Sequence, residues 1–160
     1  MKANKPRLYL AAPLFNERER LFNGQLVAEL EKQTEVFLPQ RDGLILVELV
    51  AAGIPISIAE QRVFDQDIRA MEASDFLVAV LDGGHIDEGV AFEIGYMRAL
   101  GKACVGLQTD VRRALPTGNN PMISRGLEAI CGSASEVLNF IGGRIAGNRR
   151  GLSSATFRVV

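Results

Sequence analysis

The sequence is poor in the residues that mark metal-binding, disulfide-rich and nucleic-acid-binding proteins. Two cysteines, one histidine and no tryptophan occur in 160 residues, too few for a structural zinc site or a disulfide framework. The 18 Lys and Arg nearly balance the 19 Asp and Glu, so no basic surface is expected for nucleic acid or a membrane. Cys104 and Cys131 lie among apolar residues, which predicts buried thiols in a protein of the reducing cytoplasm.

Long hydrophobic runs are also missing. No apolar stretch approaches the roughly 18 residues that span a bilayer, and residues 1–7 are too polar for a signal peptide. The remaining composition, 48% hydrophobic and 23% charged, is that of a folded globular protein. We expect a single domain over residues 1–160 with its core in about 7–141, and a Gly/Arg/Ser-rich mobile tail at 143–160.

Short apolar runs alternate with longer amphipathic segments, which is typical of βα units around a mostly parallel sheet. Strands are expected at residues 8–12, 36–38, 76–81 and 103–107, and a brief one within 129–131. Helices are expected after Asn16, from Ser57 to about Ala73, from near Asp87 to Leu100, and over 122–129 and 135–141. The stretch 44–52 fits either a short helix or a mobile loop.

Polar residues gather where the expected strands end. In open α/β sheets, ligands bind at the carboxyl ends of the strands. Tyr9 lies in the first strand, Gln40 follows the second, Asp87 follows the third and Asn120 follows the fourth. The sequence has no Gly-x-Gly-x-x-Gly turn or Walker loop, and its first strand-to-helix turn is apolar, so dinucleotide and triphosphate cradles are not expected.

The densest group of polar residues surrounds the start of the helix after the third strand. A helix that begins near Asp87 places Gly89, Glu93 and Tyr96 on one face. Glycine destabilises a helix, but it is useful where a ligand approaches the backbone closely. This face therefore becomes the leading candidate for a binding site.

Each candidate also has an ordinary structural interpretation. Asp67 and Glu93 fit solvent-exposed helix acids, and Asp87 fits a cap that complements the helix dipole. Tyr9 fits a core position in a strand, and Asn120 fits a turn residue before a proline. No single residue distinguishes these alternatives.

Several segments together are more specific, and they occur in a fixed order. They are Tyr-Leu-Ala-Ala-Pro-Leu-Phe (9–15), Phe-Asp-Gln-Asp (64–67), Ser-Asp (74–75), Asp-x-Gly-x-Ala-x-Glu-Ile-Gly-Tyr (87–96), Gly-Lys (101–102) and Asn-x-Met-Ile (120–123). This order resembles the nucleoside 2-deoxyribosyltransferase family over about residues 7–141. The resemblance implies a flavodoxin-like doubly wound α/β fold, with a mostly parallel five-stranded sheet and helices on both faces. It also implies a dimer-based homo-oligomer, commonly a hexamer, with a shared active site.

The resemblance further implies transfer of 2-deoxyribose between nucleobases with retention, through a covalent glutamyl-sugar intermediate. By position, Glu93 matches the nucleophile, Asp67 and Asp87 match acids that handle the base, and Tyr9 matches a tyrosine beside the nucleophile. The partners implied are small deoxynucleosides and free nucleobases. No metal or other cofactor is expected.

Four further residues are candidates for substrate binding. Gln40 lies near a family glutamine that contacts the base, and Asn120 matches an asparagine that holds the sugar 5′-hydroxyl in a neighbouring subunit. Gly89 and Tyr96 share the helical face of the nucleophile. The stretch 40–55 aligns loosely with the family, and the chain ends in Thr-Phe-Arg-Val-Val rather than in an aromatic residue.

Two other functions stay open on the sequence. The first is hydrolysis of the N-glycosidic bond of 2′-deoxynucleosides or their 5′-monophosphates, with His85 as the remaining candidate to activate water. The second is a non-catalytic nucleotide-sensing domain. The acids at 67, 87 and 93 favour an enzyme, and the apolar first turn favours nucleosides over nucleotides. The sequence does not give the base preference.

Overall fold

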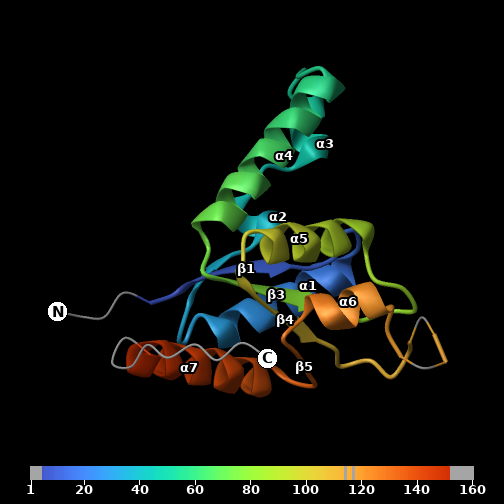
Figure 1. Cartoon of the computed structure of the whole chain (residues 1–160). Helices are drawn as coiled ribbons and strands as arrows, with labels where there is room; N and C mark the ends of the chain where they lie inside the picture. Colours follow the sequence, from blue (N-terminus) through green and yellow to red (C-terminus); the bar gives the residue numbers. More distant parts are fainter. Residues whose placement is uncertain (1–4, 114, 117, 152–160) are drawn as a thin grey trace.

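The computed structural model describes residues 5–113, 115–116 and 118–151 of the chain. Its centre is a five-stranded sheet in which all neighbouring strands run parallel, in the order β2-β1-β3-β4-β5 (Figure 1). The strands are β1 (Arg7–Ala11), β2 (Glu35–Phe37), β3 (Phe76–Val80), β4 (Ala103–Leu107) and β5 (Ala129–Cys131). This strand order is the flavodoxin-like one, with its topological switch between β1 and β3. The expected fold class is confirmed.

Helices cover both faces of the sheet. They are α1 (Glu17–Leu30), α2 (Pro39–Asp42), α3 (Leu46–Ala51), α4 (Ile56–Ala73), α5 (Glu88–Ala99), α6 (Pro121–Gly126) and α7 (Ala134–Gly151). Helices α1 and α7 pack on one face, and α4 and α5 pack on the other. Because both faces are covered, strands β3 and β4 are buried along their whole length.

The central strand β1 divides its side chains between the two faces. Leu8 and Leu10 enter the core beneath α1 and α7. Tyr9 and Ala11 enter the core beneath α4 and α5, because successive side chains of a strand point to opposite faces. This alternation sends Tyr9 towards the helices that carry the candidate acids.

Local sequence signals account for most helix starts. Asn16 caps α1 in a capping box with Glu19, and Asp87 and Asn120 cap α5 and α6 with their side chains. The expected cap at Ser57 is wrong: α4 begins at Ile56 after Pro55, without a side-chain cap, because proline already holds the extended backbone that precedes a helix.

The carboxyl-terminal expectation also needs correction. The last helix does not end near Ile141 but continues through Gly151, so residues 143–151 are helical rather than part of a tail. Its first turns bury Val137, Leu138 and Ile141 against the sheet, and this docking supports the helix despite its glycines. The remainder of the expected tail, 152–160, lies outside the described residues.

Helices α3 and α4 form an arm that stands away from the sheet (Figure 1). The stretch 44–52, left open between helix and loop, contains α3, which packs on α4. Only the base of the arm reaches the core, where Met71 of α4 is buried. Ile58, near the free end, is exposed although it lies on an apolar segment. In the described part of the chain, no helix is long and apolar enough to cross a membrane.

Candidate active site

A short hydrogen bond joins the middle of β1 to α5. The hydroxyl of Tyr9 donates to Oε1 of Glu93 at 2.6 Å. Tyr9 is fully buried and its ring stacks on that of Phe37, with centroids 5.6 Å apart. The tyrosine is therefore held from both sides, and it fixes the orientation of the Glu93 carboxyl.

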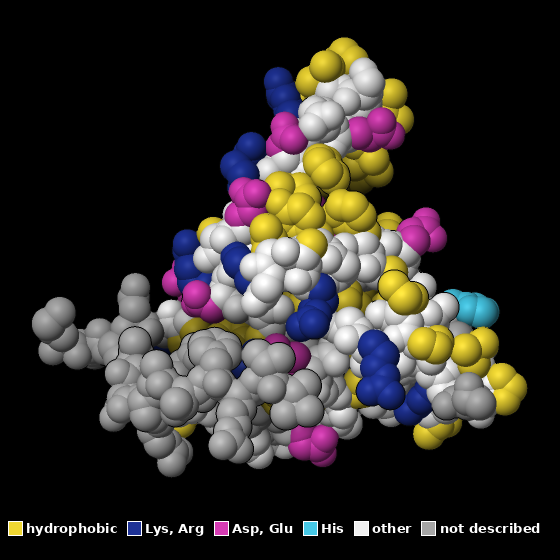
Figure 2. All heavy atoms as spheres, in the orientation of Figure 1, with side chains coloured by type: hydrophobic (Ala, Val, Ile, Leu, Met, Phe, Trp, Pro, Cys, Tyr) yellow, Lys and Arg dark blue, Asp and Glu magenta, His cyan; other side chains and the backbone are white. Residues whose placement is uncertain are grey.

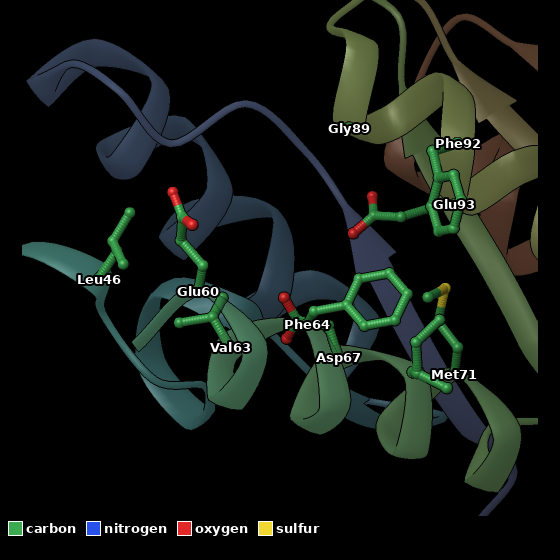
Figure 3. A pocket seen from close by; sticks show the side chains of 10 residues that line it. Leu46, Glu60, Val63, Phe64, Asp67, Met71, Gly89, Phe92 and Glu93 are labelled. Atoms are coloured by element: carbon green, nitrogen blue, oxygen red, sulfur yellow. The ribbon is translucent and has the colours of Figure 1, made fainter. Parts of the chain in front are cut away.

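Glu93 opens onto a cavity of about 350 Å³ between α4 and α5. Asp67 and Gly89 also line this cavity, so the two carboxyl groups share one space (Figure 3). The rest of the lining is mainly apolar, from Leu46, Val63, Phe64, Ile68, Met71 and Phe92. A cavity of this size with a few convergent polar groups is typical of a small-molecule site.

The apolar surroundings change the acidity of both carboxyl groups. Burial raises the pKa of Glu93 to about 8, against the hydrogen bond from Tyr9, and the charges of Asp67 and Asp87 act in the same direction as burial. Burial raises the pKa of Asp67 to about 6. Burial, with the nearby Glu93 and Asp67, raises the pKa of the Tyr9 hydroxyl. The site thus favours carboxyl groups that exchange protons near neutral pH.

Asp87 sits at the edge of this group. Its Oδ1 accepts a hydrogen bond from the backbone N–H of Val90 at 3.1 Å and caps α5, so the ordinary interpretation as a cap is part of its role. Its charge nevertheless raises the pKa of Glu93. At Gly89 a Cβ would lie 3.0 Å from Oδ1 of Asp87, so glycine leaves room for the cap and for the cavity surface.

Three of the four expected binding residues, Gln40, Tyr96 and Asn120, do not line this cavity. The amide of Gln40 accepts from Asn23 at 2.9 Å and donates to the carbonyl of Arg20 at 3.0 Å, which holds α2 against α1. Tyr96 stacks on Phe92 and donates its hydroxyl to Glu72 of α4 at 2.8 Å. A base contact by Gln40 or Tyr96 therefore remains a prediction.

Asn120 lies beside the loop between β3 and α5. Its side chain accepts from the backbone N–H of Met122 at 2.9 Å, and it lines a much smaller cavity of about 30 Å³ with His85 and Asn119. Within one chain, neither Asn120 nor His85 lines the cavity of Glu93. The structure thus brings together Tyr9, Asp67, Gly89 and Glu93, with Asp87 at the edge.

Several residues of the cavity were not predicted from the sequence. Phe64 and Phe92 are 50% and 52% exposed, and their ring centroids lie 6.1 Å apart at its mouth. Glu60 lies further along α4. A stripe with helical spacing, at 60, 63, 64, 67, 68 and 71, lines the cavity from α4. The helical spacing of these residues can be recognised in the sequence. The spacing alone does not indicate that this face of α4 lines a cavity.

The comparison with protein families identifies the family of the chain. A family model described as nucleoside 2-deoxyribosyltransferase matches residues 8–153. The chain belongs to the nucleoside 2-deoxyribosyltransferase family. This confirms the resemblance, and its most specific segment is the one that places Glu93 beside Tyr9.

Relatives in the family act on N-glycosidic bonds in more than one way. A nucleoside deoxyribosyltransferase of Limosilactobacillus fermentum is 32% identical over 129 residues, 76% of each chain. A candidate 2′-deoxynucleoside 5′-phosphate N-hydrolase 1 of Thermofilum pendens is 34% identical over 102 residues, 63% of this chain and 66% of the relative. The solved 2-deoxyribosyltransferase of Bacillus psychrosaccharolyticus superposes with a TM-score of 0.67 at 25% identity, over 82% of this chain and 89% of that one.

Proposed function

We propose that the protein is a nucleoside 2-deoxyribosyltransferase in which Glu93 is the nucleophile. The hydrogen bond between Tyr9 and Glu93, at the end of an apolar cavity that also contains Asp67, carries the proposal. A carboxylate of fixed orientation next to a second acid is the arrangement that retaining glycosyl transfer requires. The L. fermentum and B. psychrosaccharolyticus relatives support the same activity.

In the proposed reaction, an oxygen of the Glu93 carboxylate attacks C1′ of the deoxyribose. The bond from C1′ to the base nitrogen breaks, and its electron pair stays with the base, which takes a proton from Asp67. An incoming base then attacks C1′, expels the Glu93 carboxylate and returns its proton to Asp67. Two displacements at one carbon give net retention.

Asp67 is the better proton donor of the two candidate acids. Its pKa of about 6 leaves a useful fraction protonated near neutral pH, and it lines the cavity. Asp87 instead accepts a hydrogen bond at the helix start, so we assign it to holding α5 and to the electrostatics of Glu93. The ionised form of Glu93 attacks. Burial favours the protonated carboxyl near neutral pH, and the hydrogen bond from Tyr9 opposes burial by stabilising the ionised form.

The lining of the cavity favours nucleosides over nucleotides. Among the described residues that line it, three are acids and none is Lys or Arg, so nothing there would neutralise a 5′-phosphate. We also place the protein in the cytoplasm, in nucleoside salvage, and the free buried thiols of Cys104 and Cys131 support that location.

Hydrolysis is the second candidate, because the T. pendens relative carries the name of an N-hydrolase. The decisive experiment follows the loss of deoxyinosine with and without saturating adenine. We expect deoxyadenosine to form faster than free deoxyribose, because a bound base is already oriented over C1′ and excludes water. If adenine leaves sugar release unchanged and no deoxyadenosine forms, the protein is a hydrolase. Binding of deoxyinosine without release of any base would indicate a sensing domain.

We further propose that two subunits complete each active site. Figure 2 shows hydrophobic side chains over the arm and its junction with the sheet. Val47 of α3 and Ile56 and Phe64 of α4 are 72%, 60% and 50% exposed. Met122, two residues beyond Asn120, is 81% exposed. Apolar surface of this kind marks interaction sites, and a two-fold dimer would bring one subunit's Asn120 to its partner's cavity.

Mixed assemblies test the shared site. Asn120→Asp keeps an oxygen that caps α6 but removes the amide donor, and we expect it and Glu93→Gln each to be nearly inactive. Co-expressed subunits should regain up to roughly a quarter of the wild-type activity, because half of the sites in each mixed two-fold dimer are intact. Asn139→Asp, at an exposed position of α7, is the matched control and should remain active alone. Full activity of a monomer in analytical ultracentrifugation would rule out the shared site.

A further inference from the structure

The cavity extends well beyond the reacting carboxyl groups. The stripe of α4 that lines it begins at Glu60 and reaches Asp67 two turns later, a distance of about 10 Å along the helix. Val63 and Phe64 lie between the two acids. In Figure 3, Glu60 and Glu93 face the same open space from opposite ends.

Among the described residues, Glu60 and Asp67 are the two acids of α4 that have no hydrogen-bond or ion-pair partner, and both line the cavity. Asp65 accepts a hydrogen bond from Gln61, and Glu72 accepts one from Tyr96. No hydrogen bond or ion pair between described residues uses the carboxyl group of Glu60, which is exposed at the outer end of the cavity. Its acceptor oxygens are therefore available to a ligand in the cavity.

We propose that Glu60 selects nucleobases that carry an exocyclic amino group. The inference rests on the proposed function, because it takes the sugar to lie at Glu93 and the base to extend along α4. A base in that position passes over the apolar side chains of Val63 and Phe64, and its outer edge faces Glu60. The aromatic ring of Phe64 offers a stacking surface for any base, so the discrimination comes from the group at the outer edge.

A carboxylate accepts hydrogen bonds and cannot donate them. It therefore binds the amino group of adenine or cytosine, which is a donor. It repels the carbonyl oxygen that hypoxanthine or uracil presents at the same position. A hydrogen bond to a charged acceptor is stronger than one between neutral groups, so the preference for amino bases should be substantial.

A competition experiment measures this preference directly. Wild-type protein is supplied with deoxyguanosine as donor and with equal concentrations of adenine and hypoxanthine as acceptors. The ratio of deoxyadenosine to deoxyinosine formed does not depend on the fraction of active protein. We expect Glu60→Gln to lower this ratio about ten-fold, because its amide can donate to the carbonyl and has lost the charge. Glu48→Gln, an exposed acid of α3 that does not line the cavity, should keep the wild-type ratio.

The outcomes separate this inference from the proposed function. Transfer by both proteins with ratios within about two-fold of each other would overturn the role of Glu60 and leave the transferase intact. If wild-type protein forms neither product, the transferase proposal fails. The role of Glu60 is then decided by calorimetry with free adenine and free hypoxanthine. If Glu60→Gln binds adenine more weakly than wild-type protein does, with no loss of affinity for hypoxanthine, that role is supported. If the two proteins bind adenine with equal affinity, that role is overturned.

Discussion

Glu93→Gln is expected to lower the rate of deoxyribosyl transfer by several orders of magnitude while the protein stays folded. Glutamine preserves the shape of the side chain and an oxygen that accepts the hydrogen bond of Tyr9. A neutral amide, however, cannot form the ester with C1′, so the covalent route is lost. The measurement is kcat/KM for the exchange of deoxyinosine with adenine.

Glu88→Gln is the matched control for this substitution. Glu88 lies in the first turn of the same helix and is exposed, so its variant should keep near-normal transfer. Mass spectrometry adds a second readout: wild-type protein incubated with deoxyinosine should carry a deoxyribosyl group, and Glu93→Gln should not. Near-normal transfer by a correctly folded Glu93→Gln protein would assign the nucleophile elsewhere.

The same substitution is expected to stabilise the protein above neutral pH. Glu93 has a pKa of about 8 in the fold, against 4.5 for an unperturbed glutamic acid. Between these values the folded state binds more protons than the unfolded state, so the free energy of unfolding falls as the pH rises. Above about pH 8 Glu93 is ionised in both the folded and the unfolded state, and the loss in free energy of unfolding has reached its full size. Each pKa unit corresponds to about 1.4 kcal/mol, so the cost is on the order of a few kcal/mol.

Urea unfolding of wild-type protein and Glu93→Gln measures this cost. The two free energies should be similar near pH 5, where Glu93 is protonated in the fold, and should diverge towards pH 9 with the variant the more stable. Asp67, with a pKa of about 6, adds a smaller decrease at lower pH to both proteins. Parallel curves for the two proteins across this range would show that Glu93 is not held in a desolvated site.

The sequence was most informative where hydrophobic pattern and caps agree. The unbroken apolar run of β3 and the caps at Asn16 and Asp87 correspond to elements of the structure. The length of α7 was not predictable in this way, because Gly142 and Gly143 interrupt its pattern and only its docking on the sheet supports it.

A sequence does not show which distant residues lie close together in the fold, and this limited the prediction of the site. The local pattern around Glu93 and Asp67 fits ordinary helix acids, and only the family resemblance linked the two residues. The hydrogen bond from Tyr9 to Glu93 is visible only in the fold. Gln40 was expected from the resemblance to lie near the base, yet its amide is hydrogen-bonded to Asn23 and to the carbonyl of Arg20. Phe64 and Glu60 were missed because helical spacing defines a face but not what lies opposite it.

The position of Tyr9 on β1 and of Glu60 on the arm gives the two ends of the cavity different mechanical properties. Tyr9 belongs to the buried central strand, and we expect its amides to exchange with solvent only when the whole domain unfolds. The outer turns of α4 bury few side chains, and such segments open locally at a lower free energy. If Glu93 reacts and Glu60 selects the base as proposed, bond breaking is tied to the buried central strand, whereas base selection lies on an arm that opens locally at a lower free energy. Variation in the arm would then change which base is accepted without disturbing the reacting carboxylate.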